Sequence, residues 1–471
     1  MLKHALSAAP ETEASNGDEL RDAAFASLEG HAGTEAAQAL TEAVNELVLN
    51  QLAHTEFFGE PRANRKKLKP AIAAFLADLL SAEGKWVYRS LKKDSFTGPG
   101  VGARAFIALQ QAMRELGFVD HYGGVVSQWV QFDESGPALA NRRWAARYRP
   151  TNKLIALAGE HGISLDNALD HFDYGLPKQP LQKRAASTWD GGRKVQGRRL
   201  KFEHTDLSLK LEADVRELNE FLAKQTFGGG CIHRGYVRIF QNGDAADFNW
   251  DQGGRLYSQP ADKNYQQQSG ESRLDMTING SPVVEIDLRA SYLTIFYAWH
   301  GLQLDREQDP YVIPGLGEEA RAVVKLWVAA TFGSTGPLHK WPTVILEDYE
   351  EEHGHPLDTN RYPPVQLGEL IIKHHPLLRQ WGQPLKDGRV RTWADLMFDE
   401  SRVVVAAMQG LMRDGVPSLA VHDSLIVPEQ HERQGAMALM AAFGGQFRVN
   451  QVPVSPSLKI NSRQGKRLFV P

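Results

Sequence analysis

The stretch SPVVEIDLRASYLTIFYAWHG, residues 281–301, changes its hydrophobic pattern halfway along. Val283, Val284 and Ile286 predict a strand that carries Asp287 near its end. An aromatic-rich segment with a helix pattern follows that strand. One aspartate at a strand end is weak evidence of function, so the meaning of Asp287 depends on a second carboxylate elsewhere in the chain.

That second carboxylate lies in PSLAVHDSLIVPEQ, residues 417–430. Apolar residues on both sides of His422 and Asp423 predict two short strands that meet at a tight turn. Asp423 is either a turn residue bonded to its own backbone or a metal-binding carboxylate on a rigid hairpin. The presence of Asp287 favours the second interpretation, because two converging carboxylates can hold two divalent ions for phosphoryl transfer.

The composition predicts a globular protein of two or three domains. The chain has 471 residues, of which 42% are hydrophobic and 23% are charged. No apolar run approaches the roughly 20 residues that span a bilayer, and no signal-peptide pattern is present, so we expect no membrane partner. A single cysteine, Cys231, excludes a disulfide framework and fits a reducing cytoplasm. The net charge of −4 does not indicate a polyanion ligand, but the charge is unevenly distributed.

The two aspartate stretches carry a family resemblance. EIDLRASY (285–292) and LAVHDSLIVP (419–428) resemble motifs A and C of the family A nucleic-acid polymerases and of the single-subunit RNA polymerases. The resemblance implies an α+β right-hand polymerase fold, with an antiparallel palm sheet and helical fingers and thumb. It implies that Asp287 and Asp423 bind two catalytic Mg²⁺ ions, or Mn²⁺ in their place, and that His422 lies near the primer terminus. The His-Asp-Ser variant is closer to the phage-type RNA polymerases.

Two further stretches add to the resemblance. EEARAVVKLWVAATFGS (318–334) resembles motif B, and Arg321 and Lys325 are four residues apart, so both can bind a triphosphate from one helix face. The resemblance implies that Lys325 also protonates the leaving pyrophosphate and that Phe332 contacts the nucleotide, although the spacing is one residue short. A solvated helix face is the alternative for the two cations. GGRLYSQP, upstream of motif A, implies that Arg255 reaches the minor groove of a primer–template duplex.

Tyr292 bears on the choice of sugar. It lies five residues after Asp287, where family A DNA polymerases typically have Glu and where the side chain faces the incoming nucleotide. An aromatic ring there would collide with a ribose 2′-hydroxyl, which favours dNTPs. The alternative is that Tyr292 packs in the core with Phe296 and Tyr297, at helical spacing.

The N-terminal half carries a pattern typical of DNA binding. Two helix patterns, at 70–82 and 103–118, precede an alternating segment at 142–163. That segment contains a group of basic residues predicted to contact nucleic acid: Arg142, Arg143, Arg147 and Arg149. Helices followed by a basic two-stranded segment resemble the winged-helix modules of replication initiators. Solvated charge on an ordinary α/β domain is the alternative.

Residues 183–201 form a second basic stretch, with seven Lys and Arg residues against one acid. Its three glycines predict a flexible loop that makes phosphate contacts and becomes ordered on binding. The residues in it that we expect to bind nucleic acid are Lys194, Arg198 and Arg199. Ordinary solvated surface is again the alternative.

The predicted architecture has four parts. They are a flexible or weakly helical lead-in (1–44), a winged-helix-like region (45–165), a basic linker with a helical connector or thumb (166–234), and a palm with fingers (235–471). We expect a cytoplasmic, nucleoid-associated DNA polymerase that extends a primer–template with dNTPs and has no proofreading nuclease. The alternatives are an RNA polymerase or primase of the same fold, and a replication-initiator protein with an inactive polymerase-like domain.

Overall fold

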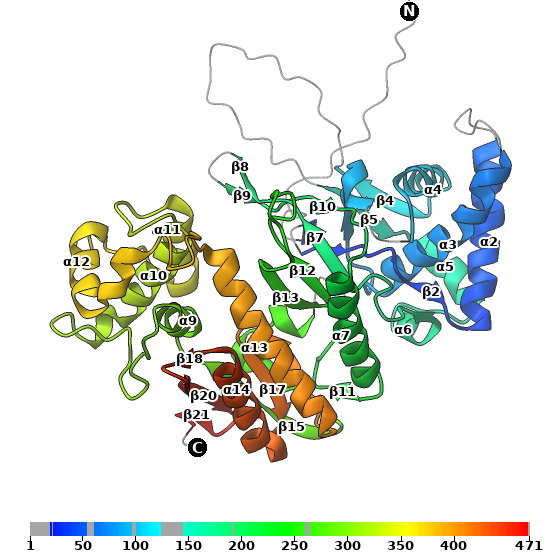
Figure 1. The fold of residues 1–471 in the computed structure, drawn as a ribbon. Coiled ribbons are helices and arrows are strands. Elements are labelled where there is room, and N and C mark those ends of the chain that lie inside the picture. Colours follow the sequence, from blue (N-terminus) through cyan, green and yellow to red (C-terminus); the bar gives the residue numbers. More distant parts are fainter. Residues whose placement is uncertain are drawn as a thin grey trace, which may run out of the picture. The chain divides into compact units, whose positions relative to one another are not determined.

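The computed structural model describes residues 19–20, 22–53, 61–96, 100–123, 145–190, 193–259 and 264–469. The chain has a mixed α+β architecture, which confirms the predicted fold class at this level (Figure 1). It divides into two compact units, Met1–Gly175 and Leu176–Pro471, and each has its own buried core. The division differs from the predicted one, which placed a boundary between residues 165 and 166.

The first unit has a core of helices packed on a small sheet. Its main elements are α2 (Glu35–Ala53), α3 (Pro61–Leu80), β3 (Val87–Arg89), α4 (Ala103–Glu115), β4 (Val119–Tyr122), β5 (Ala146–Pro150) and α5 (Asn152–Glu160). Strand β5 is antiparallel to both β3 and β4, and the short strand β1 (Ala24–Phe25) pairs in parallel with β3. The order is therefore two helices, a strand, a helix and an antiparallel strand pair.

The predictions for this unit hold in part. Helices α3 and α4 confirm the two helix patterns, and α2 already begins at Glu35, inside the predicted lead-in. The alternating segment is a strand only in β5, and the prediction is wrong for residues 152–160, which form α5. Thr151 starts this helix, because its side-chain oxygen accepts a hydrogen bond from the Leu154 amide at 3.5 Å. Arg142 and Arg143 lie outside the described residues.

Asp78 is a buried carboxylate in the middle of this first core. It lies on α3 and accepts hydrogen bonds from the Leu28 amide (2.7 Å), the Ser27 hydroxyl (3.0 Å) and the Tyr174 hydroxyl (3.2 Å). Burial nevertheless raises the pKa of Asp78 to about 6. These hydrogen bonds connect α3 to residues 27–28, which precede it in the sequence, and to Tyr174, which follows it.

The main sheet of the second unit has seven strands. They are β11 (Phe227–Gly228), β14 (Thr277–Ile278), β15 (Ser281–Leu288), β17 (Ser424–Pro428), β16 (Leu419–Val421), β20 (Leu458–Ser462) and β21 (Gly465–Leu468). All neighbouring strands are antiparallel, and β15 is paired with both β17 and β20. Strands β15, β16 and β17 confirm the predicted strand and hairpin, so the sheet joins segments more than a hundred residues apart.

A second sheet contains the two ends of the basic stretch at 183–201. Its strands are β10 (Arg199–Leu200), β7 (Leu181–Arg184), β12 (Tyr236–Phe240) and β13 (Gly253–Ser258), in that spatial order. Strands β8 (Thr188–Asp190) and β9 (Arg193–Val195) form a separate hairpin. The prediction of a loop at 183–201 is therefore wrong, because β7 pairs with both β10 and β12 and this pairing satisfies its backbone groups.

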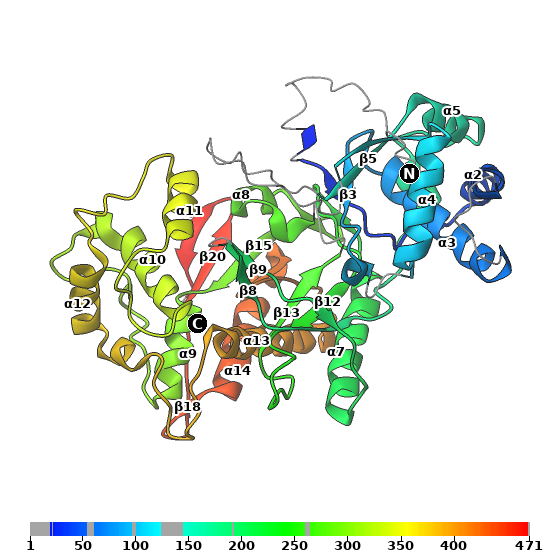
Figure 2. The same cartoon turned by 90° about the horizontal axis from the view of Figure 1, so that it is seen from above.

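Seven long helices complete the described part of the second unit. They are α7 (Asp206–Leu222), α9 (Ser291–Trp299), α10 (Arg321–Phe332), α11 (Thr343–His353), α12 (Pro364–His374), α13 (Trp393–Arg413) and α14 (Glu432–Gln446). Helices α10, α11 and α12 group together, well away from α7 (Figures 1 and 2). Helix α13 packs against α14, α9 and β13. Within the described ranges, no helix is both long and apolar enough to cross a membrane.

Candidate active site

The pairing of β15 with β17 places Asp287 and Asp423 at neighbouring positions of the main sheet. Asp287 pairs with Ser424, the residue after Asp423, and the Leu288 amide donates to the Asp423 carbonyl oxygen at 3.2 Å. The turn that carries Asp423 has His422 in a left-handed conformation with φ 52°, which His tolerates better than most residues. The predicted strand-end and hairpin carboxylates thus come together, with the exposed His422 beside them.

The carboxylates of this site repel each other. Burial, followed by the negative charge of Glu285, raises the pKa of Asp287 to about 6. Burial, followed by the charges of Glu400 and Asp287, raises the pKa of Asp423 well above its ordinary value. Lys459, which faces Asp287 across the β15–β20 pair, lowers the pKa of Asp287 and so opposes part of this effect. A group of mutually repelling carboxylates is favourable for binding a cation.

The donor set suits a hard divalent cation. In the described part of the chain, neither Asp287 nor Asp423 forms an ion pair with Lys or Arg, so both carboxylates are available as ligands. Carboxylate oxygens are the protein ligands that Mg²⁺ prefers. Among the described residues, no group of three or more His, Cys, Asp or Glu side chains is placed to hold a metal. Asp287 and Asp423 would be the protein ligands of an Mg²⁺ site at this place.

Glu285 lies two residues before Asp287 but is fully occupied by other contacts. Arg273 Nε donates to Glu285 Oε2 at 3.0 Å and Arg273 Nη2 donates to Oε1 at 2.8 Å. The hydroxyl of Ser424 also donates to Oε1, at 2.8 Å. Ser424, the third residue of the His-Asp-Ser triplet, thus connects the hairpin to β15. Its role in this structure is to hold the two strands together.

Arg255 lies in a buried network beside the two aspartates. Its Nε donates to Glu400 Oε1 at 3.0 Å, and its Nη2 contacts the same carboxylate and the Tyr292 hydroxyl, the latter at 3.1 Å. The Ser291 hydroxyl donates to the other oxygen of Glu400. The contact of Arg255 with a DNA minor groove stays a prediction, and in this structure its guanidinium is bound to Glu400 and Tyr292.

Tyr292 lies in the first turn of α9 and packs against a group of aromatic rings. Its ring is 6.3 Å from that of Phe332 in an edge-to-face arrangement. Phe332 is buried, and it also packs edge-to-face with Trp381 at 4.9 Å and Phe296 at 5.6 Å. The predicted contact of Phe332 with a nucleotide needs correction, because its ring is buried in the core, where it packs against the ring of Tyr292.

Helix α10 presents Arg321 and Lys325, as predicted from their spacing. Lys325 is exposed, and its positive charge lowers the pKa of Asp287, so the two side chains lie within electrostatic range. Arg321 Nε donates to Asp309 Oδ2 at 2.8 Å, and its guanidinium lies 5.8 Å from the Tyr311 ring centre. Lys325 therefore lies near Asp287, whereas Arg321 is bound to Asp309.

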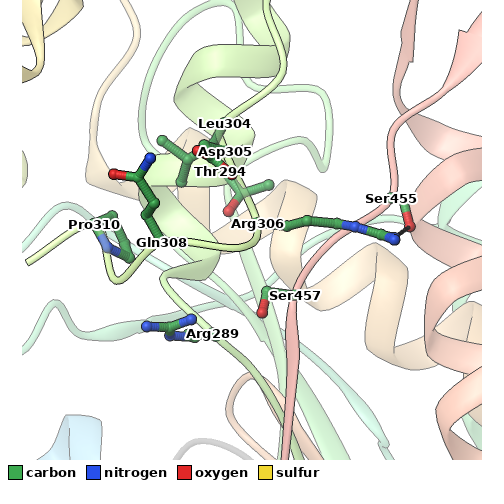
Figure 3. A pocket seen from close by; sticks show the side chains of 9 residues that line it. All are labelled: Arg289, Thr294, Leu304, Asp305, Arg306, Gln308, Pro310, Ser455 and Ser457. Carbon is green, nitrogen blue, oxygen red and sulfur yellow. Dashed lines mark hydrogen bonds between the residues drawn. The ribbon is translucent and has the colours of Figure 1, made fainter. Parts of the chain in front are cut away.

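A small polar recess lies next to this region (Figure 3). The residues that line it are Arg289, Thr294, Leu304, Asp305, Arg306, Gln308, Pro310, Ser455 and Ser457. Arg306 extends across the recess and donates to the Ser455 hydroxyl at 2.9 Å. Arg289 follows Asp287 by two residues, so the recess adjoins the end of β15.

The basic residues predicted to bind nucleic acid have different environments. Arg147 is 8% exposed and donates to the backbone carbonyls of Leu20 and Ala145, so burial contradicts its predicted contact with DNA. Arg149 is partly exposed and pairs with Asp120 at 3.1 Å. Arg198 is exposed and Arg199 is half-buried. The side chain of Lys194 lies outside the described part of the structure.

Four residues of the site did not emerge from the sequence as specific contacts. They are Ser291, Glu400, Asp309 and Lys459. Glu400 lies inside α13, the helix that precedes the hairpin. Nothing in the spacing of these residues indicates their partners, which lie on other elements of the fold.

The sequence was compared with known proteins. No family model matches it, and no curated protein matches it either. The family resemblance of the four short motifs therefore stays a prediction.

Proposed function

We propose that this chain is a template-directed DNA polymerase that extends a primer by nucleotidyl transfer and has no proofreading nuclease. The observation that carries the proposal is the β15–β17 register, which sets Asp287 beside the hairpin residue Asp423. Two carboxylates that converge from a strand end and a hairpin are the ligands required for two-metal phosphoryl transfer. The motif resemblance at 285–292 and 419–428 supports the same conclusion.

In the proposed reaction, the primer 3′-oxygen attacks the α-phosphorus of a dNTP and pyrophosphate leaves. Asp287 and Asp423 would hold two Mg²⁺ ions, or Mn²⁺ ions, which when bound promote ionisation of the 3′-hydroxyl and neutralise the charge of the leaving group. Arg321 and Lys325 bind the phosphates, and Lys325 donates a proton to pyrophosphate. Tyr292 excludes a ribose 2′-hydroxyl, and the exposed His422 borders the primer terminus.

The arrangement of elements is compatible with the proposed parts. In the second unit, the main sheet would be the palm, the group α10–α12 the fingers and α7 the thumb. In the first unit, the order of helices and strands, with β5 between β3 and β4, supports a winged-helix DNA-binding module. The template would then be DNA, and the proposed location is the cytoplasm, in association with the nucleoid.

An RNA polymerase or primase of the same fold is the second candidate. The His-Asp-Ser triplet at 422–424 favours it, because that variant resembles the phage-type RNA polymerases. Tyr292 opposes it, because the ring acts directly on the sugar. Ser424 does not act on the sugar, since its hydroxyl donates a hydrogen bond to Glu285.

Primer extension tests the proposal. The native chain is incubated with Mg²⁺ and a labelled primer–template, with dNTPs and NTPs offered separately, beside Asp287→Asn and Asp423→Asn. Asp275→Asn, which changes a side chain that is 78% exposed, is the control for loss of a carboxylate. We expect extension with dNTPs that is lost in both site variants and kept in the control. Extension with NTPs alone would favour the RNA polymerase, and duplex binding without any extension would favour a DNA-binding protein.

A further inference from the structure

One oxygen atom of Asp309 lies between two guanidinium groups. Arg289 Nη2 and Arg321 Nε are each 2.8 Å from Asp309 Oδ2. The Tyr311 amide donates to Oδ1 at 2.9 Å and fixes the orientation of the carboxylate. Arg289 follows β15 and Arg321 begins α10, so a single anionic oxygen connects the palm strand to the proposed fingers helix.

The two arginines are not saturated by this contact. Arg289 Nη1 is buried and has no hydrogen-bond partner within the described residues, and Arg289 also lines the polar recess. The side chain of Arg321 is 43% exposed, whereas that of Arg289 is 14% exposed. A buried donor without a partner is unfavourable, so an additional acceptor at this place would be stabilised.

The local charge is unbalanced toward the positive. At this contact Arg289 and Arg321 carry two positive charges, and Asp309 supplies one negative charge between them. A terminal phosphate presents several anionic oxygens, each able to take the position of a carboxylate oxygen between two guanidinium groups. Because it carries more negative charge than a carboxylate, it can replace Asp309.

We propose that Arg289 and Arg321 bind the terminal phosphates of a nucleoside triphosphate, and the pyrophosphate product, at the position that Asp309 Oδ2 occupies in the free protein. Asp309 holds the arginines in place and competes with the phosphate for them. The inference deepens the proposed function, on which it rests, by adding Arg289 and Asp309 to the predicted ligands Arg321 and Lys325. The competition also promotes the release of pyrophosphate, since Asp309 can form its ion pairs with the two arginines again.

Isothermal titration of the full-length chain with inorganic pyrophosphate in Mg²⁺ buffer tests this inference without requiring polymerisation. The variants are Arg289→Gln, Arg321→Gln and Asp309→Asn. Arg361→Gln is the matched control, because it removes an exposed arginine that pairs with the exposed Glu319. Thermal unfolding of each variant establishes that it is folded.

We expect Arg289→Gln and Arg321→Gln each to weaken pyrophosphate binding by about tenfold or more, the loss expected for a charge-assisted hydrogen bond. Asp309→Asn should tighten binding, by roughly threefold to tenfold, because the competing charge is removed. A structural role for Asp309 predicts the opposite, since misplaced arginines would bind less well. Unchanged or weaker binding in folded Asp309→Asn, or no pyrophosphate binding by the native chain, would overturn the inference. Binding that behaves as expected in a chain that extends no primer would uphold the phosphate site and refute the polymerase.

Discussion

Glu400 on α13 and Arg255 on β13 form an ion pair that is almost completely buried. The side chain of Glu400 is 2% exposed and that of Arg255 is 16% exposed. Ser291 and Tyr292 complete the hydrogen bonds of the pair, at the first turn of α9. The pair thus fixes the orientation of Tyr292 relative to the two aspartates.

Replacing Glu400 by Gln should destabilise the second unit strongly. The change removes the carboxylate that is paired with the buried Arg255 charge, and breaking a buried pair typically costs about 3–5 kcal/mol. Glu432→Gln is the control, because Glu432 pairs with Arg467 closer to the surface and should cost less than about 1 kcal/mol. The measurement is the free energy of unfolding in urea. Equal losses in the two variants would mean that the buried pair contributes no more than a surface pair.

Tyr292 should determine the choice of sugar through its ring and, to a lesser degree, through its hydroxyl. Tyr292→Ala removes the ring, so we expect discrimination between dNTP and NTP to fall by about a hundredfold in kcat/KM. Tyr292→Phe keeps the ring and its contact with Phe332 but loses the hydrogen bond to Arg255, and discrimination should fall much less. Single-nucleotide incorporation with each substrate measures both effects. Undiminished discrimination in Tyr292→Ala would assign the ring to core packing alone.

Lys325→Gln should slow the chemical step more than it weakens nucleotide binding. Lys325 is exposed on α10, within electrostatic range of Asp287, and the proposal gives it the role of acid for the leaving pyrophosphate. Loss of such an acid typically lowers the rate by about 10²–10⁴-fold. Pre-steady-state incorporation separates kcat from binding, with exposed Lys340→Gln as the control. A change in KM alone would show that Lys325 only binds phosphate.

The first unit should become less stable as the pH rises from about 4 to about 6. Burial raises the pKa of Asp78 to about 6, well above the value of roughly 4 that it has in an unfolded chain. The folded state therefore holds a proton that the unfolded state releases, and stability is highest where Asp78 is protonated. Hydrogen exchange of α3, corrected for the intrinsic pH dependence, measures this effect. The pH dependence should disappear in Asp78→Asn and persist in the control Asp166→Asn, a change at an exposed residue.

Several local elements of the fold could be predicted from the sequence, and many of their long-range partners could not. The strand that carries Asp287 and the hairpin that carries Asp423 follow from apolar runs, because periodicity reports local burial. The basic stretch at 183–201 looks like a loop by composition, but it begins in strand β7, which pairs with the distant strand β12, and no local pattern indicates this pairing. In the same way, Asp309 and Glu400 pair with arginines that are distant in sequence. These ion pairs form only in the folded chain, so residue spacing does not indicate them.

Strand β15 pairs with β17 and β20, two strands that come much later in the sequence. During synthesis it leaves the ribosome well before β17 at 424–428, and β20 at 458–462 follows later still. A nascent chain that already contains Asp287 therefore has only the short pairing of β15 with β14, and the rest of the strand has unpaired edges, a state prone to aggregation. The two aspartates come together only after β17 has emerged, so a translation product truncated before residue 424 would not have Asp287 and Asp423 side by side.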